Sequence, residues 1–273
     1  MNRNKYGFIC VVAVTMLMLA SGCGMRTRVI TPDSEEYESI PLFAQCLIEA
    51  YPNEIVGYAD NHLVWNDGTT LLYDDGLDKS VQEMLEEGDN EDMSYWLYTN
   101  VIEPFNDAGR IRNDLLFKKM YGETEYNMEK NLTTIVWCPT LVNKTVRITT
   151  VNGVDRQLQK VSDELDAHPE WRPYLEGIST INWRVVAGTN RMSAHAFGIA
   201  IDIGVSESNY WRLDYPEADE NDTIAYRNTF PLELVEVFER HGFIWGGRWY
   251  HYDTMHFEYR PEILLYRQKM ARE

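Results

Sequence analysis

The stretch that decides the fold is residues 193–202, Ser-Ala-His-Ala-Phe-Gly-Ile-Ala-Ile-Asp. Apolar and small or polar residues alternate from residue 199 to residue 204, which predicts a strand there. One face of that strand carries three isoleucines, and the other carries Asp202 between two small residues, which leaves room above its carboxylate. His195 could fold back over the same face across a bend that Gly198 permits. An isolated His–Asp pair is more often a surface carboxylate with a capping histidine, so this stretch alone specifies no chemistry.

A second stretch, residues 245–258, favours a functional site over a surface His–Asp pair. It reads Trp-Gly-Gly-Arg-Trp-Tyr-His-Tyr-Asp-Thr-Met-His-Phe-Glu and places His256 on a further predicted strand. Two histidines and one aspartate suit a tetrahedral zinc ion whose fourth position is left to water, as in catalytic sites. Such a site needs a general base, which Asp253 could supply. Glu258 shares the strand face of His256 and is either a rival base or a partner that orients the histidine, and His251 is a possible further donor.

Taken in order, the two stretches resemble a known family. Ser-x-His-x-x-Gly-x-Ala-x-Asp, followed by Trp-Gly-Gly-x-Trp and Asp-x-Met-His-Phe-Glu, is similar to the zinc peptidases of bacterial cell-wall peptides. These include D-alanyl-D-alanine carboxypeptidases, the vancomycin-resistance D,D-dipeptidases and phage L-alanyl-D-glutamate endopeptidases. The resemblance covers roughly residues 138–259, and it implies the fold that these enzymes share with the hedgehog signalling domain.

The resemblance also implies roles for individual residues. One zinc ion is implied, with the ligands His195, Asp202 and His256. Asp253 is implied as the catalytic base. The family uses an arginine upstream of the first motif to hold a substrate carboxylate or the scissile carbonyl; Arg184, on a strand predicted over residues 182–186, is the first candidate and Arg191 the second. Ser193 could hydrogen-bond the substrate or could equally be a turn residue.

The remaining pattern mixes helices and strands without a regular βαβ rhythm. This favours an α+β domain with a small antiparallel sheet and flanking helices. The predicted helices cover residues 154–167 and 232–240, and a terminal helix opens at residue 261. The further predicted strands cover residues 255–259 and two segments, 62–65 and 70–73, that form a hairpin across an Asn-Asp-Gly-Thr turn.

The N-terminus carries a targeting signal. Residues 1–22 begin with Arg3 and Lys5, continue as an apolar run and end in small residues before Cys23. This resembles a bacterial lipoprotein signal in which Cys23 is lipidated; the alternatives are a plain cleaved signal or an uncleaved anchor helix. The predicted organisation is a signal peptide (1–22), a tether (23–50), an N-terminal extension packing on the catalytic domain (51–127) and a zinc peptidase domain (128–273).

Charge and cysteine content narrow the partners. With 43 acidic and 25 basic side chains the net charge is -18, which disfavours nucleic acid and leaves an N-terminal lipid as the means of membrane attachment. The acidic run over residues 74–92 predicts a solvated face. Cys46 and Cys138 are too few for a disulfide framework; they either pair with each other or are small buried hydrophobes.

These observations predict a zinc metallopeptidase that cleaves peptidoglycan stem peptides. Asp at the base position favours the endopeptidase branch, although the resemblance to D,D-carboxypeptidases is as close, so the bond that is cut stays open. The alternative is a zinc-containing lipoprotein that binds wall peptides without cleaving them. We expect a monomer in the cell envelope, lipid-anchored to a bacterial membrane and facing the wall or the periplasm.

Overall fold

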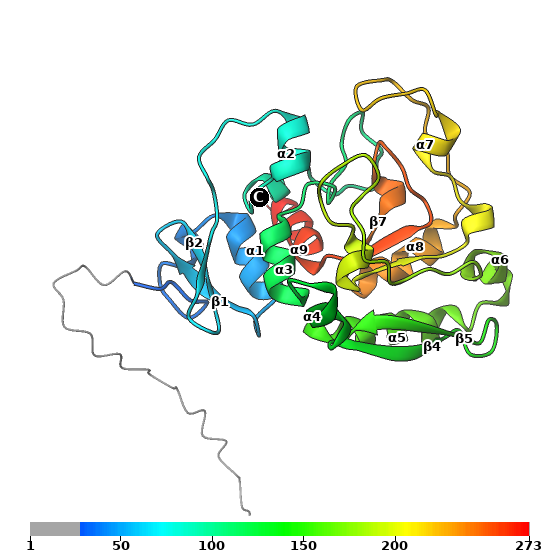
Figure 1. Cartoon of the computed structure of the whole chain (residues 1–273), viewed down its shortest axis with the longest axis horizontal. Coiled ribbons are helices and arrows are strands. Elements are labelled where there is room, and N and C mark those ends of the chain that lie inside the picture. The colour runs from blue at the N-terminus through cyan, green and yellow to red at the C-terminus, as the bar shows by residue number, and fades with distance from the viewer. Residues whose placement is uncertain (1–27, 273) are drawn as a thin grey trace, which may run out of the picture.

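A computed structural model of the chain describes residues 28–272, so the predicted signal peptide and Cys23 lie outside the described residues. Helices and small antiparallel sheets are mixed along the chain, which confirms the predicted α+β class (Figure 1). Among residues 28–272, no helix has both the length and the apolar character that crossing a membrane would require.

The strands form three separate antiparallel sheets, ordered β1-β2-β3, β4-β5 and β6-β8-β7. The strands are β1 (Ile55–Ala59), β2 (His62–Trp65), β3 (Thr70–Leu72), β4 (Leu132–Trp137), β5 (Lys144–Thr149), β6 (Ala200–Asp202), β7 (Phe243–Trp245) and β8 (His256–Tyr259). The α-helices are α1 (Leu42–Ala50), α2 (Val81–Glu87), α3 (Asp114–Tyr121), α4 (Glu125–Glu129), α5 (Val154–Leu165), α6 (Arg172–Leu175), α7 (Trp211–Asp214), α8 (Leu232–Arg240) and α9 (Pro261–Met270). Short 3₁₀ helices are η1 (Tyr37–Ser39), η2 (Asp92–Ser94), η3 (Val151–Gly153), η4 (Pro169–Trp171), η5 (Ala194–Phe197), η6 (Val205–Glu207) and η7 (Gly246–Arg248).

Most of the periodic segments are confirmed. The β2–β3 hairpin, α8 and the start of α9 lie where the sequence predicts them, and α5 ends at Leu165, two residues before the predicted end. The predicted strand over residues 182–186 is wrong. Its partner is the returning arm of its own loop, in which Val185 bridges Met192 and the Ser193 N–H donates to the Arg184 carbonyl. The segment is therefore a short hairpin-like loop outside the three sheets.

The predicted tether over residues 23–50 is corrected at its C-terminal end. Helix α1 buries Phe43, Cys46 and Leu47, and it packs against α9 from the opposite end of the described chain (Figure 1). The polar residues before residue 40 suggest a linker, but the apolar face of Leu42–Ala50 can be buried only against a helix that the sequence places more than 200 residues away. This segment is part of the folded domain.

Residues 51–127 share one hydrophobic core with the C-terminal half. The main core cluster is continuous from Tyr37 to Leu264. Polar contacts reinforce it: Tyr98 donates to Glu239 at 2.7 Å and the Trp249 indole N–H donates to the Ala108 carbonyl at 2.8 Å. The boundary predicted at residue 127 stays a prediction, but the described part of the chain shows no break in burial there.

Candidate metal centre

The third sheet brings the two motifs together. Strand β8 lies between β6 and β7, and its register sets Asp202 directly opposite His256. Opposed residues of an antiparallel pair have Cβ atoms about 4.5–5.5 Å apart, so two side chains separated by more than fifty residues in sequence emerge as neighbours. The isoleucines of the first motif are buried on the other side of β6, which fixes the side from which Asp202 projects.

His195 reaches the same place from the turn before β6. It lies in η5, a single 3₁₀ turn capped by the Ser193 hydroxyl, which accepts from the His195 N–H. The chain leaves this turn through Gly198 at φ +68°, and a Cβ there would lie 3.0 Å from Leu132 and 3.3 Å from the Thr149 amide nitrogen. Gly198 therefore makes the bend that folds His195 back over β6, as predicted.

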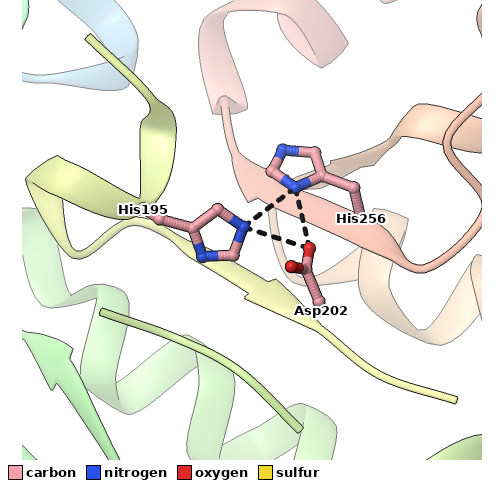
Figure 2. A group of neighbouring side chains, drawn as sticks. All are labelled: His195, Asp202 and His256. Atoms are coloured by element: carbon pink, nitrogen blue, oxygen red, sulfur yellow. Dashed lines mark hydrogen bonds and ion pairs between the residues drawn. The ribbon is translucent and has the colours of Figure 1, made fainter. Parts of the chain in front are cut away.

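Three ligand atoms converge (Figure 2). His195 Nε2 lies 3.0 Å from Asp202 Oδ1 and 3.2 Å from His256 Nδ1, and the last two atoms lie 3.0 Å apart. A tetrahedral zinc ion with bonds of about 2.0–2.1 Å places neighbouring donors about 3.3 Å apart. The triangle thus has the dimensions of one face of such a coordination sphere, and the donor set fits the metal.

Each histidine is oriented by a partner on its far side. His195 Nδ1 lies 2.6 Å from the Thr180 carbonyl, and His256 Nε2 lies 3.2 Å from the Glu258 carboxylate. Because both partners can accept, they favour a proton on the outward nitrogen of each ring, so that each ring would present a lone pair to a metal ion at the centre, as in the ligand–carboxylate arrangements of metal sites.

The charges around the triad favour a cation at its centre. Burial opposes ionisation of Asp202, but hydrogen bonds from both histidines hold the pKa of its carboxyl well below the usual range. Burial would lower the pKa of His256, yet Asp202 and Glu258 raise it to about 10. The protein without metal therefore retains a proton among these groups, where a metal ion would supply the positive charge.

Glu258 is fully occupied as an orienting partner. Its Oε2 accepts from Arg112 at 2.8 Å as well as from His256, and its Oε1 accepts from Arg260 at 2.9 Å. Burial alone would raise its pKa, but Arg112, His256 and Arg260 hold the pKa of this carboxyl far below its usual range. With its oxygens committed, Glu258 has no position from which to act as a base.

Asp253 differs from Glu258 both in its hydrogen bonding and in its pKa. It lies in the loop before β8 and lines the cavity over the triad, and its Oδ1 is buried without a hydrogen-bond partner among the described residues. Burial raises the pKa of Asp253 to about 6. A carboxylate with a free oxygen and a pKa near neutrality has the properties of a general base.

The two candidate arginines differ in burial. Both line the cavity, but Arg184 is exposed, and its guanidinium donates to the carbonyl of its neighbour Val185. Arg191 is 5% exposed, donates to the Arg110 carbonyl and forms no ion pair with the described residues. Burial, together with the charges of Arg112 and Arg110, lowers the pKa of Arg191 to about 9. A buried cation without a counter-ion is a ready site for an anion.

His251 is held at the cavity wall by a residue from the N-terminal half. Its Nδ1 lies 2.6 Å from Asp107 Oδ2, and its backbone N–H donates to Asp107 Oδ1 at 2.9 Å. Asp107, Glu220 and His251 also satisfy the spacing of a metal site. However, the Arg110 guanidinium already lies between the carboxylates, 2.7 Å from Asp107 and 2.8 Å from Glu220, so this position holds a cation of the protein itself.

The acidic run over residues 74–92 also surrounds a basic side chain of the protein. The Lys79 ammonium lies 2.7 Å from Asp75, 2.7 Å from Asp92 and 3.2 Å from Asp89. The predicted solvated face is thus partly an ion-pair cluster around a half-buried lysine.

Cys46 and Cys138 are both free and buried, so they are small buried hydrophobes and do not pair with each other.

Two histidines and an aspartate lie together at the wall of a cavity, and each histidine is oriented by an outer partner. This arrangement is typical of the class of mononuclear metal centres found in catalytic sites. Residues 187–259 match the family model described as D-alanyl-D-alanine carboxypeptidase, so this segment is similar to that family. The match contains both motifs and begins after the first arginine candidate. No curated protein and no solved structure matches the chain.

Sequence reasoning missed the outer partners. Thr180, Arg112 and Asp107 contact the ligands or the residues beside them, yet they lie 15 to 146 residues away from their partners in sequence. Arg112 lies in a segment, residues 109–122, that is more basic than the acidic region before it. This change of charge is the one signal in the sequence that could have found it.

Proposed function

We propose that the chain is a zinc-dependent peptidase that hydrolyses a peptide bond in the stem peptides of peptidoglycan, with one zinc ion held by His195, Asp202 and His256. The observation that carries this proposal is the triangle of donor atoms, 3.0–3.2 Å on a side, within the segment that matches the peptidase family. When bound, zinc supplies a Lewis acid that polarises the scissile carbonyl and makes the attacking water more acidic.

Asp253 supplies the proton transfers. Its unpartnered oxygen accepts a proton from the water that attacks the carbonyl carbon and returns it to the amine nitrogen as the C–N bond breaks. One C–O bond forms and one C–N bond breaks, so the products are a carboxylic acid and an amine. General acid–base catalysis of this kind contributes about 10²–10⁴-fold to the rate.

Arg191 binds a carboxylate of the substrate. Stem peptides carry carboxylates at their C-terminus and on acidic side chains, and a buried guanidinium without a counter-ion gains a charge-assisted hydrogen bond from such a group. Arg184, the first candidate from sequence, lies exposed at the rim and gives a weaker, solvent-screened contact. Ser193 caps the turn that carries His195 and lines the same cavity, where it can also contact substrate.

Mass spectrometry of muropeptides tests the proposal directly. Wild type should release D-Ala if it is a carboxypeptidase, or cut after the first stem residue if it is an endopeptidase, whereas H195A should leave every muropeptide unchanged. A zinc-loaded wild type that alters no muropeptide would sink the enzymatic claim and favour the alternative, a wall-peptide-binding lipoprotein. The unused Asp253 oxygen favours the enzyme, because a binding protein has no need of a base there.

We further propose that the protein is a monomer tied to a bacterial envelope membrane by a lipid on Cys23. The support is the sequence signal before Cys23 and the net charge of -18, which gives the chain no attraction of its own to anionic lipid. Incorporation of radiolabelled palmitate into wild type but not into C23A would support the anchor, and equal labelling of both would contradict it.

A further inference from the structure

Asp107 and His251 form a buried dyad beside the metal centre. Asp107 is 1% exposed and His251 is 3% exposed, and they are joined by two hydrogen bonds, one to the ring and one to the backbone of the histidine. Packing also restrains the ring: Trp211 meets it edge-on at 4.6 Å between centroids, and Phe105 lies tilted to it at 6.4 Å between centroids. The imidazole therefore has one orientation.

The orientation leaves His251 Nε2 without a partner. This nitrogen is buried and makes no hydrogen bond with the described residues, although the ring lines the cavity above the zinc ligands. Leaving a buried polar atom unpaired destabilises the folded protein. A free hydrogen-bonding atom at the wall of the cavity is explained if its partner arrives with the substrate.

A half-buried carboxylate elsewhere in the fold shows what a purely structural pair looks like. Glu239 accepts from the Tyr98 hydroxyl at 2.7 Å and from Arg248 at 3.1 Å, and it lies away from the cavity. Asp107 is paired with an arginine in the same way, but it also holds a histidine whose other nitrogen is left free. The difference between the two carboxylates is the free imidazole nitrogen.

We propose that Asp107 is a positioning residue of the peptidase site, which fixes the His251 ring so that Nε2 hydrogen-bonds the substrate beside the zinc ion. The inference rests on the proposed function and deepens it. Asp107 lies 80 residues before the segment that matches the peptidase family, so the N-terminal half of the chain completes the active site. Because the Asp107 carboxylate can only accept, the imidazole proton is held on Nδ1.

D107N tests this dependence. The variant amide has one accepting oxygen and one donating NH₂ group, and it cannot serve the backbone N–H, the ring N–H and Arg110 together. The NH₂ group turned toward the ring forces the other tautomer. We expect kcat to fall about 10- to 100-fold, with zinc content and KM within about twofold of wild type. H251Q should lower kcat about 100-fold.

Two comparisons separate positioning from support of the fold. If Asp107 acts through His251, the double variant D107N/H251Q should be no slower than H251Q alone; two independent structural losses would multiply. The control E239Q removes a half-buried carboxylate from another arginine and should leave kcat within about twofold of wild type. In long-range ¹H–¹⁵N spectra the His251 signals, identified by their loss in H251Q, should show protonated Nδ1 in wild type and bare Nδ1 in D107N.

The outcomes are distinguishable. An inactive, zinc-loaded wild type overturns the proposed function and this inference with it. An active wild type with D107N no slower than E239Q, with multiplicative losses in the double variant, or with an unchanged His251 tautomer overturns the positioning role alone.

Discussion

Arg112 and Glu258 form a fully buried ion pair, 2.8 Å between Nη1 and Oε2, that joins the N-terminal half of the chain to the strand that carries His256. Glu258 in turn lies 3.2 Å from His256 Nε2. A residue far outside the two motifs thus influences, through one carboxylate, the ring orientation of His256.

The first prediction concerns this chain of contacts. E258Q should weaken zinc binding about 10- to 100-fold, because the amide no longer enforces the proton on the outward nitrogen of His256. It should also lower the free energy of unfolding by about 3–5 kcal/mol, since Arg112 and Arg260 lose a buried partner. Competition with a chelating dye measures the first effect and urea unfolding the second. Unchanged affinity would show that His256 is oriented without Glu258.

Zinc removal should inactivate the protein and lower its stability. Chelated wild type and H195A should contain about one-tenth of an equivalent of metal or less by mass-spectrometric metal analysis, and should melt at a lower temperature than the zinc form. At zinc concentrations about 1,000 times Kd the difference in free energy of unfolding is about 4 kcal/mol. His168, which is half-buried and does not line the cavity, gives a control, because H168A should keep both metal and melting temperature.

Asp253 should lower the stability of the folded protein while it is required for activity. Burial raises its pKa in the folded protein from 3.8 to about 6, so the folded state holds the proton more tightly than the unfolded state does. The resulting penalty on folding is fully present above pH about 6 and disappears as the pH falls to about 4. D253N should therefore stabilise the metal-free protein at pH 7, by roughly 2–3 kcal/mol, while it abolishes turnover and leaves zinc bound.

Calorimetry at pH 7 and at pH 4 checks that sign. The gain in melting temperature of D253N over wild type should shrink at the lower pH. A gain that persists or grows there would mean that Asp253 is not strained by burial.

Arg191 should matter more than Arg184 for substrate binding. R191M removes the buried guanidinium and should lower kcat/KM for carboxylate-bearing muropeptides about 10- to 100-fold, the worth of a hydrogen bond between charged groups. R184M removes an exposed one and should cost about fivefold or less. Steady-state kinetics of the two matched variants show which arginine contributes more to substrate binding. A larger loss of kcat/KM in R184M would assign carboxylate binding to Arg184 instead.

Neither buried thiol should react in the folded protein. Burial raises the pKa of Cys46 and of Cys138 to about 12, so each thiolate is scarce as well as inaccessible at pH 7. Iodoacetamide labelling followed by peptide mass spectrometry should find both unmodified until denaturant is added. Rapid labelling of either one under native conditions would argue that its surroundings open.

The local sequence pattern was sufficient to predict those helices and strands that are specified by turn residues or by the spacing of their own apolar residues. The Asp-Gly turn predicts the β2–β3 hairpin, the spacing of apolar residues predicts α5 and α8, and Pro261 predicts the start of α9. The predictions that failed concern segments whose partners are remote or unusual. Helix α1 is buried only because α9 returns to it, and residues 182–186 pair with their own loop and not with a sheet.

The sequence by itself predicted the ligand types and their order, because two histidines and an aspartate suit a zinc ion and the two motifs that carry them resemble a known family. Only the tertiary structure decided what surrounds them. The register of β6 on β8, the occupation of Glu258 by Arg112, the unpaired Arg191 and the Asp107–His251 dyad all join residues distant in sequence. Such pairings are fixed by packing and by the need to satisfy buried charges, and neither leaves a local pattern in the chain.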